Sequence, residues 1–158
     1  MGKRSIKENK NIYQLSREEC GLTRSAASEI MEYISDDKIE KIESEKSLPH
    51  PEEILAMARC YKKPELCNYY CSHECPIGQE YVPEVEVKEL SQITLELLAS
   101  LNAINRSKDR LVEITVDGEI SEEERADFAR IREHLNDISV AVDTLELWLE
   151  KQAALSGE

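Results

Sequence analysis

The fold is decided by residues 21–61, GLTRSAASEIMEYISDDKIEKIESEKSLPHPEEILAMARCY. Apolar side chains recur there three or four residues apart in three stretches, the spacing that places them on one face of a helix. Thr23 and Ser35 precede two of these stretches, where a hydroxyl can accept from the free N–H groups of a helix start. Pro51 suits the first turn of the third stretch, and Gly21 suits the position just past the end of a preceding helix. The sequence therefore predicts a run of short helices.

Composition points to an all-α protein. The chain has 158 residues and a mass of 18.1 kDa, enough for one ordinary domain or two small ones. Aromatic residues make up only 5%, and Gly and Pro number five each, which argues against a β-sandwich or barrel. No apolar run approaches the roughly 20 residues that cross a bilayer, and the first ten residues lack the apolar stretch of a signal peptide. We expect a cytoplasmic protein that does not bind membranes.

The second half of the chain has a different pattern. Leucine and isoleucine recur every seven residues from Leu90 to Leu111, and a second apolar series runs from Phe128 to Leu149. Ser121 and Glu124 have the spacing of a capping box that starts the second helix. Two long helices joined by a short turn make an antiparallel hairpin, which has little core of its own and is expected to form a dimer. The candidate dimerisation residues are Leu90, Leu97, Ile104, Leu111, Ile131, Ile138 and Leu145.

These patterns divide the chain into five parts. We predict a flexible arm at 1–10, a domain of short helices at 11–63, a Cys-bearing connector at 64–83, an antiparallel hairpin at 84–152 and a tail at 153–158. The charge follows the same division. Residues 1–63 hold 12 Lys and Arg and 12 Asp and Glu, so the whole net charge of −13 falls on residues 64–158. Such a chain is not a non-specific nucleic-acid coat, but a DNA-binding face in its neutral half is possible.

The short helices carry a resemblance. The Gly-Leu-Thr opening at 21–23, the small Ala27, the Ile39-x-x-Ile42-Glu43 signature, and Lys46 and Pro49 before a closing helix resemble the lambda-repressor-like (XRE-type) helix-turn-helix proteins of Gram-positive bacteria and their mobile elements. The resemblance covers about residues 10–65, with one extra residue in the turn at 32–34. The phrase LCNYYCSHECPIG, followed by a leucine-rich hairpin, is similar to such proteins as well. The resemblance implies a dimeric transcriptional regulator that binds double-stranded DNA.

In that family the helix at 35–44 would lie in the major groove, with the exposed residues at its start against the base edges. Here those residues are Asp36, Asp37 and Glu40, which depart from the family's pattern because carboxylates accept only from cytosine amino groups and face a row of phosphates. Arg24 falls where the family places a phosphate contact, and the Lys3, Arg4 and Lys7 arm adds further cations. The candidate DNA-binding residues are Arg17, Arg24, Ser35, Asp36, Asp37, Lys38, Glu40, Lys41 and Lys46.

A second hypothesis follows from the same carboxylates. The chain is then a non-enzymatic protein–protein interaction module, whose acidic helix docks on a basic partner and no longer binds DNA. No set of catalytic residues is evident: there is no Gly-rich phosphate loop, no HExxH and no Gly-x-Ser-x-Gly. We therefore expect that the protein is not an enzyme.

The cysteines carry a third hypothesis, that of a metal- or redox-sensing adaptor. Cys67, Cys71 and Cys75 are spaced by four, and Cys60 or His73 can supply a fourth ligand for zinc or an iron–sulfur cluster. Ligands along one straight helix diverge by about 6 Å per turn, so a shared metal requires the helix to break before Cys75. The alternative is that the thiols pack as small apolar groups, as free cysteines often do.

Overall fold

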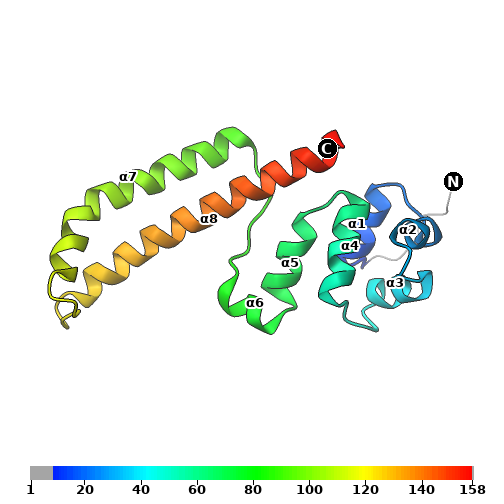
Figure 1. Cartoon of the computed structure of the whole chain (residues 1–158), viewed down its shortest axis with the longest axis horizontal. Coiled ribbons are helices and arrows are strands. Elements are labelled where there is room, and N and C mark those ends of the chain that lie inside the picture. Colours follow the sequence, from blue (N-terminus) through cyan, green and yellow to red (C-terminus); the bar gives the residue numbers. More distant parts are fainter. Residues whose placement is uncertain (1–8, 158) are drawn as a thin grey trace. The chain divides into compact units, whose positions relative to one another are not determined.

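A computed structural model describes residues 9–157, and helices are the only regular secondary structure in this part of the chain. The prediction of an all-α fold is therefore confirmed. None of the described helices is both long enough and apolar enough to cross a membrane. The described part contains eight helices (Figure 1): α1 (Ile12–Glu19), α2 (Arg24–Met31), α3 (Asp36–Glu43), α4 (Pro51–Tyr61), α5 (Glu65–His73), α6 (Pro76–Tyr81), α7 (Leu90–Thr115) and α8 (Arg125–Ser156).

The chain divides into two compact units, each with its own interior. The N-terminal unit comprises residues 9–84 together with 150–157, and the hairpin unit comprises Val85–Leu149. The six tyrosines all lie in the N-terminal unit, whereas the one tryptophan, Trp148, lies in the hairpin unit. Tyrosine and tryptophan signals therefore report on the two units separately.

The N-terminal unit is built around one apolar core supplied by five helices. The caps form as predicted: the Thr23 hydroxyl accepts from the Ala26 N–H at 3.1 Å and the Ser35 hydroxyl from the Lys38 N–H at 3.2 Å. Asn11 caps α1, and its side chain also donates to the carbonyl oxygen of Ile42 at 2.8 Å, which ties α1 to α3. The buried core residues are Tyr13, Ala27, Met31, Ile34, Ile39, Ile42, Ile54, Met57, Ala58, Tyr61 and Leu66.

The connector predicted at 64–83 is instead part of this unit. Leu66 on α5 is fully buried in the core, because α5 packs on α4. Pro76 begins α6, since proline fits the first turn of a helix. Residues 153–156 of the predicted tail are helical, because α8 continues to Ser156. The predicted arm at residues 1–8 lies outside the described residues.

Gly78 is the residue that lets α5 and α6 approach each other. A Cβ atom at this position would lie 2.0 Å from the carbonyl oxygen of Cys71, which is backbone that cannot swing aside. We expect Gly78→Ala to lower the free energy of unfolding of the N-terminal unit by about 1–3 kcal/mol, the usual cost of overpacking. Urea unfolding followed by tyrosine near-UV circular dichroism measures this. Glu80→Ala on the exposed side of α6 is the control, and an equal effect of both variants would show that α6 moves freely away from α5.

The hairpin unit consists of α7 and the part of α8 up to Leu149 (Figure 1). Arg110 on α7 donates to Asp127 on α8 at 2.8 Å, close to the turn. The predicted capping box is only half formed: the Glu124 carboxylate accepts from the N–H and the hydroxyl of Ser121, and the regular helix begins one residue later. Ile93 and Ile114 are the buried residues of α7, and those of α8 are Ile131, Ala141, Thr144 and Leu147.

Candidate nucleic-acid interface

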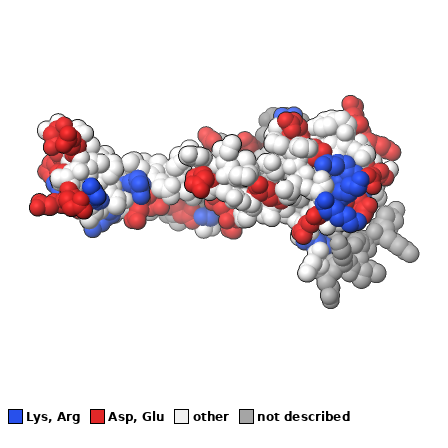
Figure 2. Space-filling model, turned by 90° about the horizontal axis from the view of Figure 1, so that it is seen from below, with Lys and Arg blue, Asp and Glu red and all other residues white. Residues whose placement is uncertain are grey.

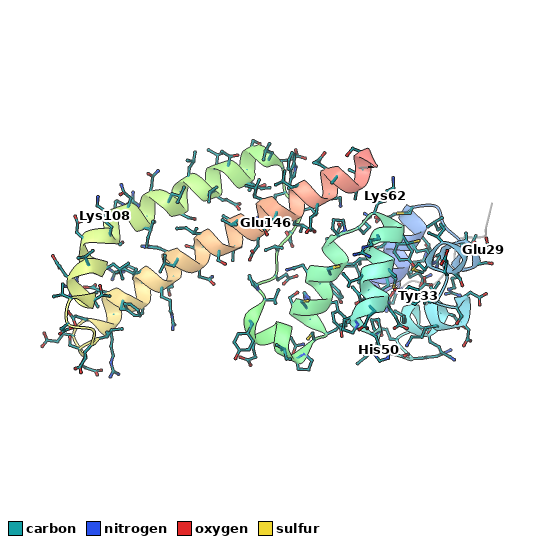
Figure 3. The ribbon with its side chains drawn as sticks, in the orientation of Figure 1. Glu29, Tyr33, His50, Lys62, Lys108 and Glu146 are labelled. Carbon is teal, nitrogen blue, oxygen red and sulfur yellow. The ribbon has the colours of Figure 1, made fainter. Side chains whose placement is uncertain are left out.

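The start of α3 is fixed by the turn that precedes it. α2 ends at Met31, and Glu32 takes a left-handed backbone conformation with φ of 62°. Ile34 then inserts into the core while Tyr33 stays exposed, its hydroxyl donating to the carbonyl oxygen of Glu52 on α4 at 3.0 Å (Figure 3). The turn therefore fastens α2 to α4 and presents the Ser35 cap of α3 to solvent.

Helix α3 has one face in the core and one face in solvent. Ile39 and Ile42 are buried together with Glu43, whereas Asp36 and Asp37 are exposed in the first turn. Carboxylates in a first turn are favourable to the helix, because they lie near its positive end. Their position is thus explained by helix stability, and it also makes the outward start of α3 acidic.

Glu43 holds two arginines, and this corrects one predicted site. Arg17 on α1 donates to both carboxylate oxygens of Glu43, at 2.5 and 2.9 Å, and to the carbonyl oxygen of Leu22 at 2.7 Å. Its side chain is 7% exposed and that of Glu43 1%. Burial disfavours the Arg17 cation, but the hydrogen bonds and charge of Glu43 outweigh this and raise the pKa of Arg17. Arg17 is therefore a structural residue, and it is not placed to touch a phosphate.

Arg24 is the arginine of this cluster that reaches the surface. Its Nε donates to Glu43 at 2.7 Å, and 37% of its side chain is exposed at the start of α2. One edge of its guanidinium is thus anchored by a buried carboxylate. A planar guanidinium held in this way is well suited to a phosphate oxygen.

The three lysines around α3 each lie beside a carboxylate. Lys41 contacts Asp37 at 2.7 Å and Lys46 contacts Glu40 at 3.6 Å, in pairs that are half exposed or more. Lys38 is more enclosed, donating to the Ser47 hydroxyl at 3.1 Å and lying 3.4 Å from Glu53. Figure 2 shows a compact group of Lys and Arg side chains on this unit, bordered by Asp and Glu. Of the predicted DNA-binding cations other than Arg17, Lys38 and Lys41 lie on α3, Lys46 follows it, and Arg24 contacts Glu43 of the same helix. All four are held in ion pairs.

Comparison with known proteins assigns neither a family nor a function to this chain. No protein-family model, curated protein or solved structure matches the chain.

The cysteine cluster predicted as a metal site is not assembled. Helix α5 ends at His73, so the chain breaks before Cys75 as a shared metal would require. Even so, no three His, Cys, Asp or Glu side chains within residues 9–157 are gathered as metal ligands are. The residues Cys60, Cys67, Cys71 and Cys75 are all partly buried free thiols. Because they do not form a ligand set, we derive no metal chemistry from them.

The thiols are also expected to be poorly reactive. Burial raises the pKa of Cys60, Cys67 and Cys71 above the usual value for a thiol, so the thiolate, which is the nucleophile, is scarce at pH 7. We predict slow alkylation by iodoacetamide at pH 7, with the rate rising as the pH passes above 9. The same protein unfolded in urea should react several-fold faster at pH 7. Equal rates in the two states would contradict the protection that burial provides.

Most of the predicted dimerisation residues are wholly or partly covered by the hairpin itself. Ile131 is buried, and Leu90 is exposed, whereas the other members are half-buried: Leu97, Ile104, Leu111, Ile138 and Leu145. The exposed large apolar side chains of α8 are different ones, Leu135, Val142, Leu149 and Leu155.

Sequence reasoning missed Glu43 and Tyr33 as site residues. A signal for Glu43 was present, since it follows Ile39 by four residues and therefore shares its inward face. A carboxylate on an apolar face requires a cationic partner. Nothing in the local sequence identifies Tyr33 as the residue that joins the turn to α4.

Proposed function

We propose that the N-terminal unit binds double-stranded DNA with α3 in the major groove, and that the protein is a dimeric transcriptional regulator. The observation that carries this proposal is the combination of a helix held rigidly on its inner side with an outer side free of core residues. Ile39, Ile42 and Glu43 fix α3, and Thr23 and Ser35 leave the starts of α2 and α3 at the surface. These features support the proposal, because in helix-turn-helix proteins one helix enters a groove while its neighbour crosses the phosphate backbone.

The carboxylates around α3 do not prevent this function. The Lys41–Asp37 and Lys46–Glu40 pairs are solvated, and such pairs contribute only about 0–1 kcal/mol. A phosphate can therefore replace the carboxylate as the partner of either lysine at small cost. Asp36 and Asp37 at the start of the helix can accept from cytosine amino groups. We thus expect operators with cytosine at those positions.

The test is a fluorescence anisotropy titration of the full chain against fragments of the host genome, at low and near-physiological salt. Lys41→Glu and Lys46→Glu should each weaken binding about tenfold, because a hydrogen bond to a charged group is worth about 1.5–3 kcal/mol. Each should also reduce the slope of log affinity against log salt by about one. Recovery of inverted half-sites in the retained fragments supports the dimer.

Lys62→Glu is the matched control for these variants. Lys62 is exposed just past the C-terminal end of α4, whereas His50 marks the other end of that helix, near α3 (Figure 3). Its charge reversal changes the net charge equally and should leave the affinity within about twofold, apart from the long-range effect of charge. If all three reversals weaken binding alike, attraction is by net charge alone, and α3 is not the interface.

A second candidate function rests on Asp36 and Asp37, which are exposed at the start of α3 and therefore available to a basic protein partner. In that case the chain shows no DNA affinity even at low salt. The triple variant of Asp36→Asn, Asp37→Asn and Glu40→Gln should then abolish capture of the partner, because the recognised negative charge is gone. If the first proposal holds, the same variant should still bind DNA and should bind random-sequence fragments more tightly, because three negative charges that face the phosphates are removed. The variant therefore separates the two functions.

A further inference from the structure

An apolar seam on α8 is left uncovered by the hairpin to which it belongs. Leu135, Val142 and Leu149 are 47%, 40% and 54% exposed. They are spaced by seven residues, about 10 Å along the helix, and so form one line on its surface. Partly buried Ile138 and Leu145 lie between them in the three–four alternation. Such a seam with a period of seven is the pattern along which a second helix packs.

A line of polar residues runs beside this seam, also with a period of seven. It consists of Arg132, Ser139 and Glu146, all exposed. Neither Arg132 nor Glu146 has an ion-pair partner among residues 9–157, so both are available to a second molecule. Glu146 lies in the C-terminal half of α8 (Figure 3). Arg132 and Glu146 thus lie on either side of the small Ser139, each seven residues away.

This spacing is self-complementary under one kind of symmetry. A two-fold axis perpendicular to α8 at Val140 brings Arg132 of one copy to within two residues, about 3 Å along the helix, of the level of Glu146 of the other, and the reverse, because an isologous contact pairs residue i with j and j with i. The same antiparallel alignment packs Val142 against the partner's Ile138 and Leu135 against the partner's Leu145. A parallel alignment would instead place this line of residues beside the opposite flank of the partner helix, so Arg132 and Glu146 would not meet.

We propose that α8 is an antiparallel homodimer interface, with the seam of Leu135, Val142 and Leu149 at its centre and two Arg132–Glu146 ion pairs that set its register. The occupant of the seam is a second copy of this chain. Two hairpins joined in this way form a four-helix bundle, in which the half-buried residues of each hairpin are covered by the helices of the other. This surface lies on the hairpin unit, so the proposal stands whether or not the N-terminal unit binds DNA.

The test is sedimentation equilibrium of the full chain without DNA. Arg132→Glu and Glu146→Arg should each weaken the dimer about tenfold, because each reversal creates two like-charge contacts per dimer. The double variant Arg132→Glu with Glu146→Arg restores both pairs and should return the dissociation constant to within about threefold of the wild type. A role of either residue in folding alone would not give this rescue.

The apolar seam is tested by Val142→Lys, with Val112→Lys as the matched control. Val112 is 63% exposed on α7 and lies outside the seam. We expect Val142→Lys to weaken the dimer about a hundredfold and Val112→Lys to leave it unchanged, with equal helicity by circular dichroism. A wild-type chain that stays monomeric at 100 µM, a double variant no better than the single ones, or equal effects of the two lysines would each overturn the proposal. Because no DNA is present, these outcomes are distinct from failure of DNA binding by the N-terminal unit.

Discussion

Replacing Glu43 by glutamine is expected to lower the free energy of unfolding of the N-terminal unit by about 3–5 kcal/mol. The carboxylate is 1% exposed and binds two guanidinium groups, one of which is nearly as deeply buried. Glutamine keeps the shape but removes the negative charge, so the Arg17 cation remains inside the protein without compensation. Urea unfolding followed by tyrosine near-UV circular dichroism measures the loss, because the tyrosines are confined to this unit.

The control for Glu43→Gln is Glu40→Gln, on the same helix and in a solvated pair with Lys46. Its cost should be at most about 1 kcal/mol. A double variant, Arg17→Met with Glu43→Leu, should recover much of the stability, since a buried ion pair can often be replaced by apolar side chains. If Glu43→Gln costs no more than Glu40→Gln, water reaches the pair, and Glu43 is not what holds α3 against α1.

The features that sequence analysis predicted well are local ones. The caps Thr23 and Ser35 and the inward face of α3, with Ile39 and Ile42, are where the sequence placed them. Capping and helical periodicity depend on residues within four positions of each other, so a single sequence contains the information.

The role of Arg17 could not be predicted in the same way. Its partner Glu43 is 26 residues away, and only the packing of α1 against α3 brings the two together. From the sequence alone, an arginine on a short amphipathic helix is equally consistent with a surface cation. The prediction that Arg17 contacts phosphate failed for this reason, whereas Arg24, seven residues later, remains available.

The hairpin shows a different limit of pattern analysis. The apolar series of α8 includes Ile131 and Leu135 alike, yet only Ile131 is buried. The buried face turns instead toward Ala141 and Thr144, whose small side chains permit close approach. Apolar character indicates that a side chain will be covered by something, but not that its own chain covers it. Leu135 and Val142 therefore stay exposed and are available to contact another molecule.

Replacing Leu66 by alanine should cost about 2–5 kcal/mol of the stability of the N-terminal unit. Leu66 is fully buried and packs with Tyr61 and Met57 of α4 in the same core. Removing its methyl groups leaves a cavity that the surrounding helices fill only in part. The expected size of this loss distinguishes an integral fifth helix from a connector that merely follows the domain.

The comparison variant for Leu66→Ala is Ile77→Ala on α6, where the side chain is 73% exposed and the change should stay within about 0.5 kcal/mol. Tyrosine circular dichroism follows the N-terminal unit, and Trp148 fluorescence shows whether the hairpin unit is affected as well. If Leu66→Ala costs as little as Ile77→Ala, α5 is a connector after all. If the proposed DNA binding holds, the affinity should also fall at temperatures near the lowered midpoint, because α4, on which Leu66 packs, carries the Tyr33 contact that positions α3.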